Sequence, residues 1–438
     1  MERKVGRDSV WPESTILKFP AMASNPRSFD RRQIYRPFLE RLTPEFSGAE
    51  FGDLIVPPAH DPRDPDQPPI HVAFASTAEL NRGVQLALVG GIGSGKTTEL
   101  RLTANLLKRH QDAVNIFVDV AEMTDIDGLN PGALLIAIGI RLNQRLLLAR
   151  KQTPETKVAF NQLQSLAHGK TEWVQQYPEV PEAEDIENQD EDFPPIPIHT
   201  PGQLKPRFPA ITRDVGNVRD LVIAITAPLL EADAQITVLI DGLDRLIRPE
   251  RFRGFVEQDL RALRDHKISV IVAAPLLSWF DQTKFLQDYF EEVRHIPAAV
   301  SDPEKSDFLK EVLVRRGALG LMDERGVADL ARFSGGVLRD LITLARTSAE
   351  AAYRDDADRI APNHIETAIS QMGKRYLTGL GHTHRFLLRR LIDNRQFPLD
   401  NPVAKELLVN RQVLEYCTDG LDSFAVHPAL EHILSGLE

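Results

Sequence analysis

The strongest constraint on this chain is a glycine-rich segment that follows a short apolar run. Residues 86–89 read LALV, and residues 90–97 read GGIGSGKT, which matches the pattern G-x-x-x-x-G-K-[ST]. Glycines let backbone N–H groups approach a phosphate where a β-carbon would block the way, and lysine adds a positive charge. The alternative is a glycine-rich turn that binds nothing, but the apolar run before it and the helical pattern after it favour a nucleoside-triphosphate site. The predicted binding residues are Gly90, Gly91, Ile92, Gly93, Ser94, Gly95, Lys96, Thr97 and Thr98, with the Thr97 hydroxyl as a ligand for Mg²⁺.

Size and composition restrict the class of protein further. A chain of 438 residues is long for one hydrophobic core, so two or three domains are expected. Its single cysteine, Cys417, excludes an internal disulfide framework and suits a reducing cytoplasm. No apolar run approaches the roughly 20 residues of a membrane span, and the first residues lack the apolar core of a signal peptide. These features predict a cytoplasmic protein without a membrane anchor.

Most of the net charge of −11 comes from residues 179–192, which hold eight acidic residues and no basic one. The acidic balance therefore does not exclude nucleic acid as a partner. This run lies within residues 151–215, where proline recurs and no Lys or Arg occurs between Lys170 and Lys205. Low hydrophobicity with high charge disfavours ordering, so we expect an acidic, partly disordered insert. It is either a solvated excursion or a docking segment for a basic partner.

From residue 71 onward, apolar strand patterns alternate with helical patterns. Such alternation predicts an α/β fold, in which a parallel sheet carries helices on both faces. Strands are predicted at residues 84–89, 115–120, 236–241, 268–274 and 293–296, and helices at residues 98–109, 132–150, 219–230 and 279–289. Residues 1–70, rich in proline and charge, are expected to form one helix at 32–42. They either wrap over a neighbouring domain or remain partly disordered.

The second informative segment is ITVLIDGLDRL at residues 236–246, an apolar strand that ends in an acidic residue. In an open α/β sheet, ligands bind at the carboxyl ends of the strands. Asp241 is therefore predicted to hold Mg²⁺, directly or through water, beside Lys96 and Thr97. Asp244 is the next carboxylate that could orient an attacking water, and the alternative is that it caps the following turn.

Beyond residue 300 the pattern changes to helices. The most informative part is FSGGVLRDLITLAR at residues 333–346. Ser334 is a predicted helix N-cap there, and Arg339 falls on the first turns of that helix. Without further context, an arginine at this position is an ordinary helix-surface residue.

The last part of the chain predicts a small winged-helix-like module. A basic amphipathic helix and a second helix at residues 402–409 precede two alternating segments, VLEYCT and SFAVHP. Two strands after helices are typical of a wing. The pair His382 and His384 is interpreted as the start of the first helix rather than as a metal site, because no cysteine and few acidic residues accompany it.

Four segments together reveal a family resemblance. GSGKTTEL, IDGLDRL, SGGVLRDL and the ending LLVNRQVLEY…VHPAL resemble bacterial P-loop ATPases of the AAA+ superfamily. The likeness is closest to the branch of origin-recognition and transposition-type ATPases, and to STAND and KAP regulatory NTPases. It covers roughly residues 75–438. Together with the proline-rich composition of residues 1–70, which lie outside the resemblance, it predicts an N-terminal extension and Pro-rich linker (1–70), a P-loop core with a five-stranded parallel sheet (71–300), a helical lid (301–375) and a winged-helix-like domain (376–438).

The resemblance also assigns site residues. It places the Walker B magnesium aspartate on Asp241 and the sensor-2 arginine, which reaches from the lid to the γ-phosphate, on Arg339. It places an arginine that can act on a neighbouring subunit's nucleotide on Arg294. Two departures concern the catalytic partners: Gly242 stands where the family has its catalytic glutamate, and the sensor-1 strand ends in Ala273-Ala274-Pro275 instead of a polar residue. Both indicate slow turnover or a switch rather than a fast motor.

Three functions are consistent with these features. The first is an ATP-binding, Mg²⁺-dependent, slowly hydrolysing regulatory ATPase that forms a homo-oligomer and controls a protein effector, as in bacterial phage-defence systems. The second is a DNA-binding ATPase of the origin-recognition or transposition type, without sequence-specific readout because the helix at residues 402–409 is largely apolar. The third is a catalytically inactive nucleotide-binding scaffold. In the second, the phosphate contacts would come from Arg385, Arg389, Arg390 and Arg395.

Overall fold

The computed structural model describes residues 26–42, 54–56, 67–109, 113–123, 126, 129–149, 151–168, 215–246, 248–300, 308–418 and 420–436. Within these ranges, no helix is both long and apolar enough to cross a membrane. The acidic run at residues 179–192 lies outside the described residues, so the predicted disorder of that part of the insert stays a prediction.

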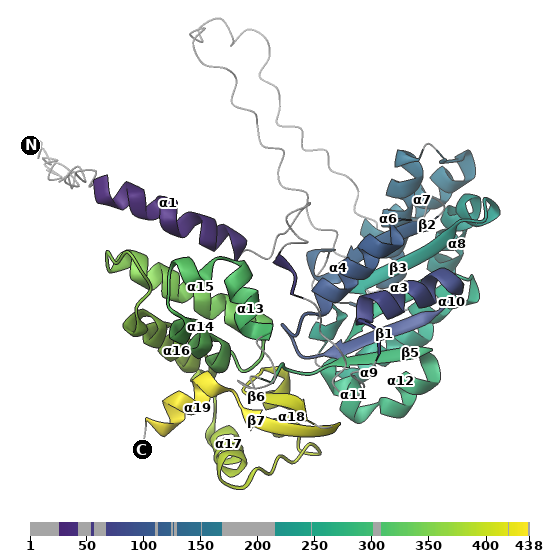
Figure 1. The fold of residues 1–438 in the computed structure, drawn as a ribbon. Coiled ribbons are helices and arrows are strands. Elements are labelled where there is room, and N and C mark those ends of the chain that lie inside the picture. The colour runs from purple at the N-terminus through teal and green to yellow at the C-terminus, as the bar shows by residue number, and fades with distance from the viewer. Residues whose placement is uncertain are drawn as a thin grey trace, which may run out of the picture.

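The predicted five-stranded parallel sheet is present (Figure 1). Its strands are β1 (Gln85–Gly90), β2 (Ala113–Asp119), β3 (Gln235–Asp241), β4 (Ser269–Ala274) and β5 (Glu292–Ile296). They follow the order β2-β3-β4-β1-β5, and every neighbouring pair is parallel. The carboxyl ends of all five strands therefore lie at one edge of the sheet, and the phosphate loop leaves β1 at that edge.

Helices cover both faces of the sheet, as predicted. One face packs against α3 (Ile70–Leu80) and α4 (Lys96–Leu107). The other face packs mainly against α6 (Ala133–Leu148) and α8 (Val215–Glu231), with further cover from α9 (Pro249–Phe255), a π-helical turn η4 (Val256–Leu260) and α10 (Arg261–Asp265). Alternate residues of each strand enter the two cores, which explains why the strand sequences are continuously apolar rather than alternating.

β1 illustrates this arrangement. Leu86 and Leu88 belong to the core on the α3 and α4 side, whereas Ala87 and Val89 belong to the core on the α6 and α8 side. All four side chains are fully buried. Burying a leucine side chain contributes about 1.5–3 kcal/mol, so the strand that carries the phosphate loop is held firmly from both faces.

Three features of the core differ from the sequence prediction. The insert starts with an ordered helix, α7 (Pro154–His168), because Ala159, Leu163 and Ala167 recur every four residues and pack against α6 and α8. The single helix predicted at residues 279–289 is two helices, α11 (Leu276–Asp281) and α12 (Thr283–Tyr289), separated by the extended φ of Gln282. Helix α3, just before β1, is not predicted from the sequence at all.

The helical part after the sheet consists of α13 (Phe308–Arg315), α14 (Glu324–Phe333), α15 (Leu338–Arg354) and α16 (Pro362–Leu377), and we call it the lid. The N-terminal helix α1 (Pro26–Arg41) lies along α15 (Figure 1). Tyr35 of α1 is buried there, and its hydroxyl donates to the Ala357 carbonyl at 3.2 Å. Farther along, Arg315 donates to the Ile55 carbonyl at 2.5 Å. Residues 26–42 and 54–56 therefore pack on the lid, which is one of the two outcomes left open by the sequence.

The predicted winged-helix-like module follows the lid. It comprises α17 (His382–Asn394), α18 (Pro402–Val409), the antiparallel strands β6 (Val413–Thr418) and β7 (Leu421–Val426), and α19 (Pro428–Ser435). Helix α19 packs on α16, and one continuous hydrophobic core includes Leu344 of the lid together with Leu388 and Leu430 of the module. The lid and the C-terminal module therefore pack together beside the sheet, and Leu276 and Leu277 of α11 belong to the same core (Figure 1).

Candidate nucleotide-binding site

The phosphate loop joins the end of β1 to the first turn of α4. Gly93 and Gly95 have φ angles of +88° and +109°, in the left-handed region that favours glycine. Lys96 and Thr97 are the first two residues of α4, which starts two residues earlier than predicted. The free N–H groups and positive dipole end of this helix therefore face the space enclosed by the loop, as anion binding requires.

Lys96 is buried and fully bonded within the site. Its Nζ donates to the carbonyl of Gly90 at 2.8 Å and of Gly91 at 2.7 Å. It also lies 3.0 Å from Oδ2 of Asp244, whose side chain is only 12% exposed. A lysine ammonium has three donors, so these partners use all of them. Phosphate oxygens would have to replace some of these contacts.

Carboxylates from two adjacent strands meet beside Lys96. Asp119 ends β2 and Asp241 ends β3, and the register of the sheet pairs them directly. Burial raises the pKa of Asp241, and the negative charges of Asp244 and Asp119 raise it further, while a hydrogen bond with Thr97 acts in the opposite direction. Thr97 and Asp241 therefore lie together, as the predicted magnesium site requires. Asp119 was not predicted, although its position at the end of an apolar strand is the same signal that identified Asp241.

Gly242 adopts a conformation that excludes a larger side chain. Its φ is +92°, and a β-carbon there would lie 3.2 Å from both the Ala121 nitrogen and Oδ1 of Asp119. A glutamate at this position would therefore strain the backbone and crowd the start of α5 (Val120–Met123). The carboxylate that approaches the loop comes instead from Asp244, in the 3₁₀ turn η3 (Leu243–Arg245).

The lid contacts the loop through the first turn of α15. The Arg339 backbone nitrogen donates to the Gly93 carbonyl at 3.4 Å. A β-carbon on Gly93 would come within 2.7 Å of the Arg339 Cβ, and one on Gly95 within 3.2 Å of Leu338. These two glycines therefore leave room for the lid as well as for a phosphate. Ser334, predicted as the N-cap of this helix, is instead the C-cap of α14, and Val337 occupies the N-cap position of α15.

Arg339 lies in a positive environment. Partial burial and the nearby charges of Arg411 and Arg245 lower its pKa, while Asp244 and Asp340 act in the opposite direction. Like charges repel one another unless an anion lies between them, so the surroundings of Arg339 favour a phosphate group. Asp244 links this cluster to Lys96 on the phosphate loop.

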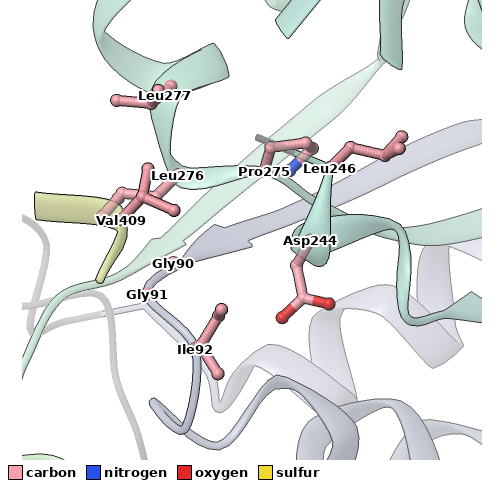
Figure 2. A pocket seen from close by; sticks show the side chains of 9 residues that line it. All are labelled: Gly90, Gly91, Ile92, Asp244, Leu246, Pro275, Leu276, Leu277 and Val409. Carbon is pink, nitrogen blue, oxygen red and sulfur yellow. The ribbon is translucent and has the colours of Figure 1, made fainter. Parts of the chain in front are cut away.

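A small pocket opens beside the phosphate loop (Figure 2). Asp244 projects toward the loop in this view, and Val409 at the end of α18 lies across Gly90 and Gly91 from it. The C-terminal module therefore contributes to the wall of the site. The other lining residues are Ile92, Leu246, Pro275, Leu276 and Leu277.

The residues present fit Mg²⁺ and a triphosphate. Mg²⁺ is usually held by one or two carboxylates, with waters and phosphate oxygens completing its shell. Asp241 with the Thr97 hydroxyl, and Asp119 beside them, provide such a set. Within the described ranges no group of three or more His, Cys, Asp or Glu could hold a metal ion by itself, so His382 and His384 do not form part of such a group.

Arg294, which the resemblance assigns to a neighbouring subunit's nucleotide, is already paired in the structure. It lies within β5, is 9% exposed, and its Nε donates to Glu292 at 2.6 Å. A role on a neighbouring subunit would require this ion pair to open, and it stays a prediction.

The parallel sheet, the phosphate loop, the helical lid and the winged-helix-like module together form the α/β P-loop fold that the sequence predicts. No protein-family model matches the chain, and no curated protein matches it. Among solved structures it is similar to the Aeropyrum pernix Orc1 protein in complex with DNA, at 14% identity over 88% of this chain and 96% of that chain, with a TM-score of 0.42.

Two further structures have a similar degree of likeness. Drosophila ORC bound to DNA has 12% identity, covers 100% of this chain and 96% of that chain, and has a TM-score of 0.41. The Thermotoga maritima RuvB Holliday junction branch migration motor has 13% identity, with coverage of 83% and 92% and a TM-score of 0.40. At such low identity we infer no function from these similarities, and the proposals below rest on the geometry of this chain.

Proposed function

We propose that the chain binds ATP with Mg²⁺ at the phosphate loop, hydrolyses it slowly, and acts as a nucleotide-dependent switch. The main support is the meeting of Lys96, Asp241, Asp244 and Arg339 at one loop, from three separate parts of the chain. ATP is proposed over GTP because the sequence has no N/T-K-x-D guanine motif. The described residues offer no feature that identifies a protein effector or a role in phage defence, so those expectations stay predictions.

The chemistry follows from the contacts in the site. Thr97 and Asp241 would hold Mg²⁺, which neutralises phosphate charge when bound. Lys96 exchanges its carbonyl partners and Asp244 for phosphate oxygens. The released Asp244 carboxylate can then accept a hydrogen bond from the attacking water and orient it. Hydrolysis is slow in this proposal because Gly242 stands in place of the usual catalytic glutamate. Asp244 has to serve both as the counter-ion of Lys96 and as the group that orients water.

The lid and the C-terminal module provide the response to the nucleotide. Arg339 is anchored on the loop by its backbone and carries a guanidinium group that can contact the terminal phosphate. Contacts that form only with ATP shift the equilibrium between open and closed lid toward the closed state. Loss of the terminal phosphate on hydrolysis removes these contacts. Because the lid and module share a hydrophobic core, they would move together. Self-association linked to ATP is a further proposal, in which each subunit completes the site of its neighbour.

The test is equilibrium binding and phosphate release by the full chain. We expect Mg²⁺-dependent ATP binding and slow phosphate release, both lost in Lys96→Ala. Arg339→Ala should keep ADP binding and lose the preference for ATP. Turnover equal to that of Lys96→Ala would favour the inactive scaffold, and absence of ATP binding would refute the proposal.

DNA binding is a second candidate, and it rests on the exposed face of α17. Arg385, Arg389 and Arg390 are exposed there, and Phe386 is 58% exposed between them. Cations beside an aromatic ring suit phosphates and unstacked bases. Helix α18, the expected reading helix, instead docks on α11 through Lys405 and Asp281 at 2.8 Å. This docking favours backbone contacts over base readout.

Salt-dependent binding tests this second candidate. Three exposed arginines that neutralise phosphates should give affinity that falls steeply as salt rises. Reversing Arg385, Arg389 and Arg390 to glutamate should remove most of the salt dependence, with lid-located Arg325→Glu as a matched exposed control. Binding that is absent, or equal in all three proteins, would contradict a DNA-binding role for α17.

A further inference from the structure

The C-terminal module places an arginine next to the nucleotide-sensing turn of the lid. Arg411 follows α18 by two residues, just before β6. Its Nη1 donates to Oδ1 of Asp340 at 2.8 Å. Asp340 is the residue directly after Arg339 and is 1% exposed. Arg411 is therefore tied to the first turn of α15, although 71 residues separate it from Asp340 in the sequence.

Arg411 also lies close to the phosphate-binding groups. Two residues before it, Val409 lines the pocket together with Gly90, Gly91 and Asp244. The positive charge of Arg411 is one cause of the lowered pKa of Arg339, together with burial. The turn from α18 to β6 therefore faces the mouth of the nucleotide site from the side opposite the sheet.

Two contacts hold the Arg411 guanidinium group, the hydrogen bond to Asp340 and the ring of Tyr376, whose centroid lies 5.8 Å from Cζ. Arginine has five N–H donors, and only one is used in the contact with Asp340. Asp340 has other partners, since it accepts a hydrogen bond from Tyr376 at 2.6 Å and lies 3.3 Å from His427 Nε2. Burial lowers the pKa of His427, so Arg411 is the main counter-ion of this buried carboxylate, and a contact with a nucleotide would add to that role.

The backbone of Arg411 ends α18. Its φ is +63°, the left-handed conformation that commonly follows a helix C-cap, here Asn410. Arg411 is only 17% exposed, so its side chain is held against the protein and does not extend into solvent.

We infer that Arg411 determines nucleotide specificity by binding the terminal phosphate of ATP beside Arg339. This contact closes the C-terminal module over the site. The inference rests on the proposed ATP site. The charges agree with this assignment. Around the loop and the first turn of α15, four positive charges come from Lys96, Arg245, Arg339 and Arg411. Two negative charges come from Asp244 and Asp340. The remaining positive charge suits a polyphosphate, and the magnesium carboxylates lie on the sheet side of the loop.

Comparison of ATP and ADP affinity tests the inference. Dissociation constants for both nucleotides are measured with Mg²⁺ for the unaltered chain and for Arg411→Gln. Losing a hydrogen-bonded charge contact should weaken ATP binding by about 10- to 100-fold. ADP binding should stay within about twofold, because ADP lacks the terminal phosphate. Arg411→Lys, which keeps the charge, should recover part of the ATP affinity.

Arg375→Gln is the matched control. Arg375 also lies near Asp340, at 3.9 Å, but its side chain is 56% exposed, against 17% for Arg411. If Arg411 only balanced the charge of Asp340, Arg411→Gln and Arg375→Gln would change nucleotide affinity alike, which would overturn the inference. Equal losses of ATP and ADP affinity in Arg411→Gln would overturn it as well. An unchanged ATP-to-ADP ratio in Arg411→Gln, in a chain that binds ATP, overturns the inference alone. Absence of ATP binding in the unaltered chain overturns the proposed function and the inference with it.

Discussion

Replacing Asp244 by asparagine should tighten ATP binding while slowing hydrolysis. In the structure Asp244 neutralises Lys96 at 3.0 Å, in a site where the two side chains are 12% and 3% exposed. An incoming phosphate has to displace this carboxylate from Lys96 and then tolerate its negative charge nearby. Asparagine keeps the shape and a hydrogen-bond acceptor but removes the charge, so the competition with phosphate becomes weaker.

The size of the effect follows from the distances. Two unit charges 4 Å apart interact by about 4 kcal/mol at an effective dielectric constant near 20. Part of this gain in binding free energy is offset, because Lys96 loses a charged partner in the free protein. The removal of water from the site on ATP binding also costs free energy. We expect a net gain of about 1–2 kcal/mol, which is a 5- to 30-fold lower dissociation constant for ATP.

The assay is a titration with a fluorescent ATP analogue, paired with phosphate release. Asp233→Asn is a suitable control, because Asp233 pairs with Arg82 at 2.7 Å on an exposed surface. Unchanged or weaker ATP binding in Asp244→Asn would refute the view that Asp244 is the counter-ion of Lys96. Unchanged phosphate release would refute its role in orienting water.

Two further predictions concern buried carboxylates. Burial and the negative charges of its neighbours raise the pKa of Asp241, so Asp119→Asn should lower it. Mg²⁺-dependent ATP binding should then persist to lower pH. A binding titration between pH 5 and 8 that matches the unaltered chain would contradict this. Burial raises the pKa of Asp259 on η4 to about 7, against about 3.9 in an unfolded chain, although Asp259 accepts hydrogen bonds from the backbone at the start of α6. The folded state therefore retains a proton that the unfolded chain loses, and the contribution of Asp259 to stability declines between about pH 4 and 7 by up to ~1.4 kcal/mol per pH unit. Asp259→Asn should become more stable relative to the unaltered chain as the pH rises from 5 to 8, and a constant difference in melting temperature would count against the assignment.

The elements that the sequence predicts well are those with a local signal. The glycines before Lys96 and the apolar strands at the centre of the sheet are continuous patterns, so their positions agree closely with the structure. Asp241 could be placed because it ends such a strand. Asp119 ends one too, but its importance emerges only from the pairing of β2 with β3, which brings the two carboxylates together.

The lid and module show where local signals are insufficient. Ser334 has the residue type of an N-cap, yet Gly335 and Gly336 take φ angles of +62° and +83° and separate it from α15. Gly336 also packs so closely on the Ala299 backbone that a β-carbon would clash, which no helix pattern reveals. Arg411 carries no motif, and only the docking of the C-terminal module brings it to Asp340. Long-range packing therefore determines the half of the site that lies opposite the sheet.

The central claim is that ATP changes the position of the lid and C-terminal module relative to the sheet. Spin labels on cysteines introduced at the exposed residues Arg219 of α8 and Arg390 of α17 would report this directly by double electron–electron resonance, since Cys417 is buried. The account predicts different distance distributions with Mg²⁺–ATP and Mg²⁺–ADP, and no difference in the Lys96→Ala background. Identical distributions with the two nucleotides, in a chain that binds both, would contradict the switch.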